Sequence, residues 1–267
     1  MVLPRDAANS QGERNQELLA HFETDGFAIM GGVLSEEQLE AARTQLDLAA
    51  SRAAEAGMPT RLEALDPGGQ NIRVYDLIEN VPISRDLAVH PGVLTLVDAI
   101  LGDALLSNFT ANNALPGSQS MNAHCDQSTV MPEPWPEIFA LNAIWCLHDT
   151  DEENGATRYL PGSHRITRFS DVPADPKEGM RAFEAKAGSV ILMHGRMWHT
   201  SGENRSQARE RWLLFAFYAR SFLRTQCNWQ QSLSGATRAE LSRELRQRIG
   251  LSGGNTMYGS YLASTER

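Results

Sequence analysis

The N-terminal part of the chain carries two different spacings of apolar residues. Residues 12–23 place their apolar side chains on one face, which predicts a helix. The short apolar run GFAIMGGVL follows, and it predicts a strand bounded by glycines. Ser35 then begins a second helix, because Gln38 completes a capping box and apolar residues recur at helical spacing to about Ala56.

Two further segments complete the helical regions. The stretch PTRLEALDPGGQNIR is rich in turn-forming residues and predicts a loop. The segment HPGVLTLVDAILG predicts a helix that ends at Gly102. Near the C-terminus, apolar residues recur every four positions from Leu241 to Ile249, and a glycine follows. This spacing predicts a final helix.

Between about residues 105 and 224 the pattern changes to short apolar runs that are rich in β-branched and aromatic residues. Gly, Pro, Asn and Asp separate these runs, which are LLSNFTANNAL, FALNAIWCLH, ATRYLP, SVILMH and RWLLFAFYAR. Short strands at this spacing predict an antiparallel sandwich or barrel. We therefore expect a mainly β protein with flanking helices around a double-stranded β-helix (jelly roll, cupin-like) core.

The chain is long enough for one large domain or two small ones. With 42% hydrophobic residues it can form a sizeable core. We expect residues 1–267 to form a single domain, with a mostly helical N-terminal part (1–104), a jelly-roll core (105–225) and a helical C-terminal part (226–267). A division at about residue 104 is the alternative, although no flexible linker marks it.

Composition excludes several classes of partner. The formal charge of -9 argues against nucleic acid and anionic membrane surfaces, which favour clustered Lys and Arg. No 18-residue apolar run is present to span a bilayer, and the N-terminus lacks an apolar signal-peptide core. The three cysteines show no CxxC spacing, which favours a cytoplasmic location. Oligomeric state stays open.

The segment HCD is the first candidate for chemistry. In a strand, His124 and Asp126 would point to the same face, where an imidazole and a carboxylate are two of the three ligands of an Fe(II) facial triad. A polar strand end is the alternative, because the pair alone is common. The third ligand has four candidates, which are His148, His164, His194 and His199. His199 is preferred, since polar turn-forming residues and a basic cluster follow it.

An arginine in that basic cluster could bind a dicarboxylate cosubstrate. A guanidinium offers two parallel hydrogen bonds to a carboxylate and keeps its charge. Arg211 begins a predicted strand twelve residues after His199, and Arg205 and Arg209 are close rivals. Solvated surface charge is the alternative for all three.

These residues lie in segments that resemble a known family. HCD, NAIWCLHDTDEENGATRYLPGSH and WHTSGENRSQARERW resemble the phytanoyl-CoA dioxygenase family of Fe(II)/2-oxoglutarate oxygenases, as does the opening DGFAIMGGVLSEEQLEAAR. The similarity covers about residues 20 to 226. Bacterial family members of this compact size often tailor secondary metabolites, so the resemblance implies a bacterial enzyme with such a role.

The resemblance implies that His124, Asp126 and His199 hold Fe(II), with 2-oxoglutarate and O2 as cosubstrates. The expected reaction oxidises an unactivated C–H bond of a small organic molecule, such as a natural-product intermediate, and releases succinate and CO2. The same site could instead epimerise, cyclise or desaturate its substrate. A non-catalytic jelly roll that binds a metal or a ligand is the remaining alternative.

The resemblance also implies residues that bind the cosubstrate. The family's anchoring arginine usually follows the distal histidine by eleven residues, where this chain has Glu210. Alignment of the downstream segment LLFAFYARSFLR with the family selects Arg211 as the anchor, with Arg209 as the fallback. Thr157 is expected to hydrogen-bond 2-oxoglutarate, and Trp145 to line its pocket.

One position departs from the family pattern. The family often has Gln three residues before the first histidine, where this chain has Met121, so Asn113 or Asn122 is expected to replace that contact. Loops rich in glycine, proline and aromatics predict a lid over a medium-sized small-molecule substrate. The residues expected to line the substrate pocket are Arg73, Tyr75, Met131, Trp135 and Trp198.

Overall fold

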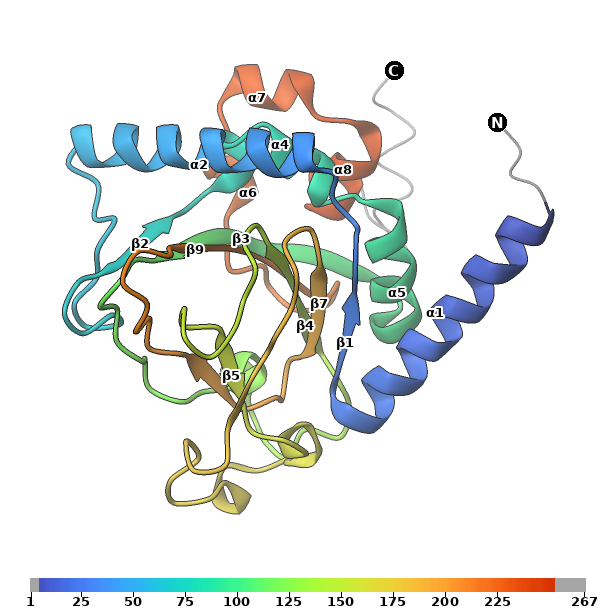
Figure 1. Cartoon of the computed structure of the whole chain (residues 1–267). Coiled ribbons are helices and arrows are strands. Elements are labelled where there is room, and N and C mark those ends of the chain that lie inside the picture. The colour runs from blue at the N-terminus through green and yellow to red at the C-terminus, as the bar shows by residue number, and fades with distance from the viewer. Residues whose placement is uncertain (1–4, 253–267) are drawn as a thin grey trace.

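The computed structural model describes residues 5–252, with side chains from residue 11 onwards. The N-terminal part is mainly helical, with two short strands (Figure 1). Its elements are α1 (Arg5–Asp25), β1 (Phe27–Met30), α2 (Glu36–Glu55), β2 (Asn71–Val74), α3 (Leu77–Asn80), α4 (Ile83–Leu87) and α5 (Pro91–Leu101). Of the predicted helical C-terminal part (226–267), residues 253–267 lie outside the described residues.

Two antiparallel sheets form the core. The larger sheet has the order β1-β7-β4-β9-β3-β2, and the smaller one the order β6-β5-β8. Their remaining strands are β3 (Ala104–Ala114), β4 (Ala140–Cys146), β5 (Thr157–Tyr159), β6 (Arg181–Ala182), β7 (Val190–His194), β8 (His199–Ser201) and β9 (Arg211–Arg220). Short 3-10 turns η1 (Asp126–Thr129), η2 (Ser163–Arg165) and η3 (Phe169–Asp171) connect some of them. This arrangement is the expected jelly roll.

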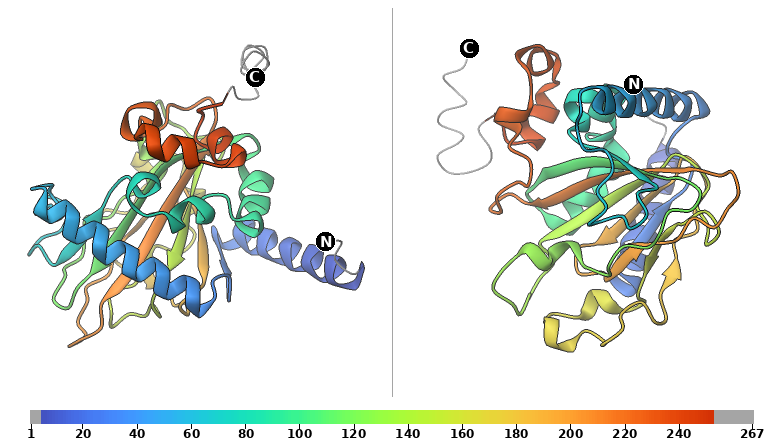
Figure 2. Two further views of the ribbon diagram at one scale, coloured as in Figure 1. Left: turned by 90° about the horizontal axis from the view of Figure 1, so that it is seen from above. Right: turned by 90° about the vertical axis from the view of Figure 1, so that its left-hand side faces the viewer.

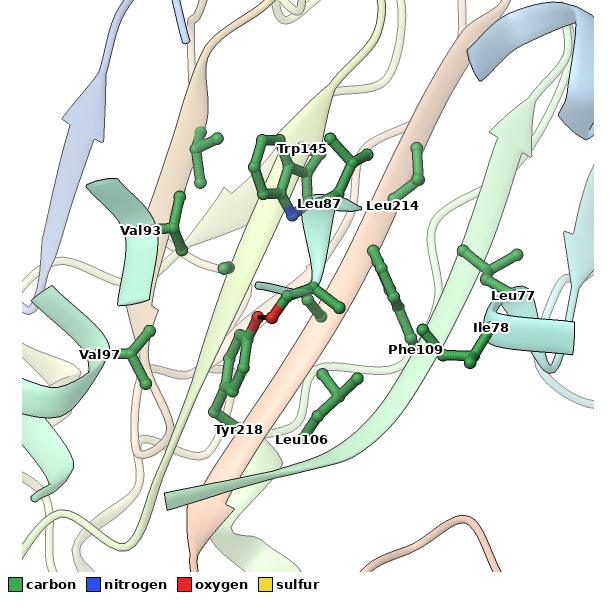
Figure 3. Packing of buried hydrophobic residues seen from close by; sticks show 14 of the residues in the cluster. Leu77, Ile78, Leu87, Val93, Val97, Leu106, Phe109, Trp145, Leu214 and Tyr218 are labelled. Atoms are coloured by element: carbon green, nitrogen blue, oxygen red, sulfur yellow. Dashed lines mark hydrogen bonds between the residues drawn. The ribbon is translucent and has the colours of Figure 1, made fainter. Parts of the chain in front are cut away.

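The larger sheet has one face toward the helices and one toward the interior of the jelly roll. Helices α2 to α5 and the C-terminal helices α6 (Trp229–Ser232), α7 (Gly235–Glu240) and α8 (Arg243–Arg248) lie over its outer face (Figure 2). Side chains alternate along β9, so Trp212, Leu214 and Tyr218 pack into the core beneath these helices. Figure 3 shows Leu214 and Tyr218 in this core. The residues of β9 that alternate with these, including Phe215, face the interior of the jelly roll.

Local sequence signals account for the ends of several helices. The Ser35 side chain accepts a hydrogen bond from the Gln38 backbone, and the Gln38 side chain accepts one from the Ser35 backbone, so the predicted capping box is confirmed. Helix α5 ends at Leu101, and Gly102 follows it at φ 73° as expected. Helix α1 begins at Arg5, earlier than predicted.

Two expectations need correction. The segment PTRLEALDPGGQNIR was expected to be a loop, but its last residues belong to β2. This strand forms because Asn71–Val74 pair in register with Ala111–Ala114 at the end of β3. The single C-terminal helix predicted from Leu241 to Ile249 is shorter, since Ser242 caps a new helix by accepting a hydrogen bond from the Leu245 backbone. Leu241 therefore lies in the break between α7 and α8.

Two further findings concern the length of the helices and the state of the cysteines. None of the helices in residues 5–252 is long and apolar enough to cross a membrane. Cys125, Cys146 and Cys227 are all free thiols.

Candidate metal centre

The first two expected ligands do not lie on a regular strand. His124 forms an isolated antiparallel bridge with His199, through backbone hydrogen bonds of 3.0 and 2.8 Å. Asp126 begins the 3-10 turn η1. The expected strand is therefore reduced to one paired residue, although the bridge still holds His124 beside His199 at the start of β8.

The three side chains converge on one point. The Nε2 atom of His124 lies 4.0 Å from Oδ1 of Asp126, and Nε2 of His199 lies 3.8 Å from the same oxygen. All three ligand atoms are within 4.8 Å of one another. Two imidazoles and one carboxylate at this spacing are the donor set of a facial triad.

Local hydrogen bonds orient both imidazoles for this role. Nδ1 of His124 lies 3.0 Å from the Asn122 carbonyl, and Nδ1 of His199 lies 2.9 Å from the Met197 carbonyl. A carbonyl only accepts, so each Nδ1 carries the proton and each Nε2 keeps a lone pair for a metal. Burial, together with the neighbouring His124, lowers the pKa of His199 and favours its neutral form.

A further side chain, which the sequence reasoning missed, orients the carboxylate. Asn142 on β4 donates a hydrogen bond from Nδ2 to Oδ2 of Asp126 at 3.2 Å. The other carboxylate oxygen, Oδ1, stays directed toward the imidazoles. The available signal was that Asn142 is the single polar residue in the buried strand Ala140–Cys146.

The triad opens into a cavity of about 190 Å³ that also contains Arg211. Arg211 is only 1% exposed, and its Nε, Nη1 and Nη2 atoms have no hydrogen-bond partner among the described residues. Burial, and to a smaller extent the Arg73 guanidinium, lowers the pKa of Arg211 to about 10. The group is therefore still charged at neutral pH, and a buried unpaired cation requires an anion.

These observations fit the expected cofactors. Two Nε2 lone pairs and one carboxylate oxygen can hold Fe(II) and leave adjacent positions open. The unpaired guanidinium of Arg211 in the same cavity can receive a carboxylate of 2-oxoglutarate through two hydrogen bonds.

The other arginine candidate lies elsewhere. Arg209 is 43% exposed in its side chain and forms ion pairs of 2.6 Å with Asp151 and with Glu153. It does not line the cavity. Arg205 is also on the surface, where its guanidinium lies 3.7 Å from Glu152.

The remaining cosubstrate candidates differ in whether they line the cavity. Thr157, at the start of β5, lines the cavity. Asn113 does not, because it hydrogen-bonds Glu210 and the Arg211 backbone, and the preceding residue Asn112 faces the cavity instead. Trp145 points into the core under the helices, so the expectation that it lines this pocket is not met (Figure 3).

The expected substrate residues also separate. Arg73 lines the cavity and forms an ion pair with the buried Asp66, with its Nε 2.6 Å from Oδ2. Met131 lines an adjoining cavity of about 240 Å³, which shares Phe217 and Gln226 with the first. Tyr75 lines neither cavity.

Trp135 and Trp198 have a packing role in the structure. Both belong to a small apolar cluster with the buried Cys125, and both contact Phe169 edge-on. Neither lines the metal cavity. The expectation that they line the substrate pocket is therefore not met, since both side chains pack in this cluster.

Most of the cavity lining was not anticipated. The additional residues are Asn108, Thr110, Asn112, Asn142, Ser201, Phe215, Phe217 and Gln226, with Met121 at the position that departs from the family. Alternation along β9 could have identified Phe215 and Phe217, because they lie four and six residues after Arg211. On β3 the alternation shifts at an irregularity between Leu106 and Asn108.

The other histidines do not join the triad. His148 accepts a hydrogen bond from the Trp212 backbone at 3.1 Å. His194 ends β7, where its ring lies 5.7 Å from the ring of His164. Neither His148 nor His194 lines the metal cavity.

Comparison with known proteins agrees with this geometry. A family model described as Phytanoyl-CoA dioxygenase (PhyH) matches residues 22–211. The chain is 39% identical over 249 residues to dioxygenase af480 of Aspergillus fumigatus, which covers 93% of this chain and 81% of that protein. Since that relative is fungal, the similarity extends beyond the bacterial members.

Two solved structures share the fold. HygX from Streptomyces hygroscopicus with nickel, 2-oxoglutarate and hygromycin B bound has a TM-score of 0.61 at 18% identity, covering 79% of this chain and 89% of that one. The epimerase SnoN in complex with Fe3+, alpha ketoglutarate and nogalamycin RO has a TM-score of 0.63 at 22% identity, covering 84% and 91%.

Proposed function

The chain belongs to the phytanoyl-CoA dioxygenase family and is an Fe(II)- and 2-oxoglutarate-dependent dioxygenase, and we propose that it oxidises an unactivated C–H bond of a small natural-product intermediate. One observation carries the assignment of its residues. Arg211, which is buried and whose guanidinium has no hydrogen-bond partner among residues 11–252, shares one cavity with a cluster of two imidazoles and a carboxylate.

In this proposal His124, Asp126 and His199 hold the iron. Their hydrogen bonds to Asn122, Met197 and Asn142 fix each ligand before the metal binds, which reduces the cost of organising the site. When bound, Fe(II) and 2-oxoglutarate activate O2 and supply the oxidant, with release of succinate and CO2.

Arg211 is the proposed anchor for the cosubstrate. Its guanidinium would pair with the carboxylate of 2-oxoglutarate that is distant from the metal. Thr157 and Asn112 line the same cavity and would add hydrogen bonds to the cosubstrate. The buried strand around Arg211 excludes water, which strengthens this ion pair.

The substrate is proposed to bind on the other side of the cavity. Asn108, Phe217 and Gln226 line this region, and the adjoining cavity adds mainly apolar side chains. An uncharged molecule with some oxygen functions and an apolar body suits neutral amides next to phenylalanine. We propose hydroxylation as the outcome and no nucleic acid as partner, in line with the charge of -9.

The chain is further proposed to act as one domain in the cytoplasm. A single apolar cluster extends from Phe22 in α1 through the larger sheet to Ile249 after α8, which supports one cooperative unit. The three free cysteines support a reducing compartment.

The test is turnover of 2-oxoglutarate to succinate by the purified chain with Fe(II), together with the anaerobic absorption of the iron and 2-oxoglutarate complex. Asp126→Ala should lose both signals, and the exposed Asp171→Ala should keep both. An Asp126→Ala protein that binds iron and turns over normally would show that the ligands are misassigned. Incubation with candidate natural products should yield a product with one additional oxygen atom.

A further inference from the structure

A further cavity, of about 410 Å³, lies away from the metal centre beside helix α1. Helices α1 and α5 lie next to one another at this edge of the larger sheet (Figure 1). The cavity is bounded by these two helices, by η2 and by the turn between β7 and β8. None of its lining residues belongs to the metal cavity.

The helices contribute the apolar wall. Phe22 from α1 and Ile100 from α5 line the cavity, together with Leu19 and Ile138. Phe22 also stacks on the ring of His194, with centroids 5.7 Å apart and planes at 20°. This wall offers aliphatic and aromatic contacts to an apolar ligand.

A cationic wall adjoins the apolar one, and its Arg165 donates a hydrogen bond from Nη2 to the Thr24 carbonyl of α1 at 2.5 Å. Arg196 and Arg165 both line the cavity, and no carboxylate lies within ion-pair distance of either one among the described residues. Arg196 donates a hydrogen bond from Nη1 to the Trp135 carbonyl at 2.8 Å. Its buried Nε has no hydrogen-bond partner among the described residues. Glu23 is the one acidic side chain of the lining, and it is exposed at the rim.

Two buried histidines complete this wall. Nδ1 of His194 accepts a hydrogen bond from the Arg196 backbone at 3.0 Å, so the neutral ring carries its proton on Nε2 as a donor. His164 is only 4% exposed, and its ring lies within hydrogen-bonding reach of the Glu23 backbone in α1. The buried Nε of Arg196, which has no partner among the described residues, calls for a ligand that pairs with it.

We propose that this cavity is a second small-molecule site, which binds an amphipathic organic carboxylate. The carboxylate would pair with Arg196 and Arg165, and its apolar body would lie against Phe22 and Ile100. The guanidinium of Arg196 cannot lose its charge at neutral pH, so the bound anion offsets the cost of its partial burial.

The site is joined to the metal centre by one short turn. Arg196 precedes the iron ligand His199 by three residues, and the Gly195 carbonyl in the same turn accepts a hydrogen bond of 2.7 Å from the backbone of Gln127. Gln127 follows Asp126 directly. A ligand at Arg196 therefore contacts the turn that leads to His199, and a backbone hydrogen bond joins that turn to the segment that carries Asp126.

Calorimetric titration with 6-phenylhexanoate tests the proposal, with its primary amide as the uncharged probe. The titration is done on the whole chain saturated with 2-oxoglutarate, so that Arg211 is occupied. We expect one acid molecule to bind per chain, and the amide to bind at least tenfold more weakly. Arg196→Gln should weaken acid binding about tenfold or more, through loss of a charge-assisted pair.

Two further variants separate this site from others. Ala99→Trp, at an exposed position of α5 that lines the cavity, should fill it and abolish binding. Arg168→Gln removes an arginine outside the cavity and should leave binding unchanged. The unfolding temperature of each variant without ligand shows whether it folds.

Three results would overturn the proposal. Equal binding of acid and amide would mean that the arginines do not recognise the carboxylate. Binding that persists in a folded Ala99→Trp but disappears in Arg211→Met would place the probe in the metal cavity. Absence of binding to the folded wild-type chain would exclude this class of ligand.

Discussion

Replacement of Arg211 by Met tests whether the buried guanidinium exists for the cosubstrate or for the fold. Methionine has a similar length and no charge, so it can fill the same space in β9. In the structure the three guanidinium nitrogens have no partner among the described residues, and the side chain is 1% exposed. The substitution therefore removes no intramolecular hydrogen bond of the side chain.

The two states of the protein should respond in opposite directions. Without ligand, Arg211→Met should unfold at the same or higher denaturant concentration, because a buried unpaired polar group costs about 1–3 kcal/mol. With 2-oxoglutarate, loss of one partner of a buried ion pair costs about 3–5 kcal/mol. This corresponds to a roughly hundred- to several-thousand-fold weaker affinity.

The assay combines urea unfolding of the metal-free chain with anaerobic titration of 2-oxoglutarate into the Fe(II) form. Arg209→Gln is the matched control, since its ion pairs with Asp151 and Glu153 lie on the surface and its loss should leave the affinity unchanged. A large loss of stability in Arg211→Met with unchanged affinity would refute the reasoning. A large loss of affinity in Arg209→Gln would show that the wrong arginine was chosen.

Three further predictions concern the supporting residues. Asn142→Leu removes the hydrogen bond that orients Asp126 and should weaken Fe(II) affinity about 10- to 100-fold in anaerobic titration, whereas unchanged affinity would exclude this role. Burial lowers the pKa of His194 to about 3, below the ordinary 6.5, so its contribution to stability is present above pH 6.5 and is lost as pH falls toward 3. Between pH 6.5 and 5 the unfolding free energy should fall about 2 kcal/mol further in the wild type than in His194→Gln, and equal losses in urea titrations would contradict this assignment. Tyr218→Phe leaves the Ala88 carbonyl unpaired and should lower the unfolding free energy by about 1–3 kcal/mol with iron binding unchanged, and an unaltered urea midpoint would show that this bond contributes nothing (Figure 3).

The sequence by itself determined those features that depend on neighbouring residues. Ser35 and Gln38 specify the start of α2, and Gly102 specifies the end of α5, because caps form between residues a few positions apart. The change from helical to strand-like spacing near residue 104 identified the β core for the same reason. The pair of His124 and Asp126 was also identified as a candidate from its separation of two residues and from the family resemblance, although Asp126 lies in a 3-10 turn and not in the expected strand.

Only the tertiary structure decided which side chains share the site. Arg211 pairs with Ala114 across β9 and β3, and this register directs Asn112 into the cavity and Asn113 away from it. A shift of one residue in register exchanges the two faces of a strand, and long-range hydrogen bonds set that register. Asn142 reaches Asp126, sixteen residues away in sequence, for the same reason. The sequence could therefore name the chemistry, while the fold decided which arginine and which amides face it.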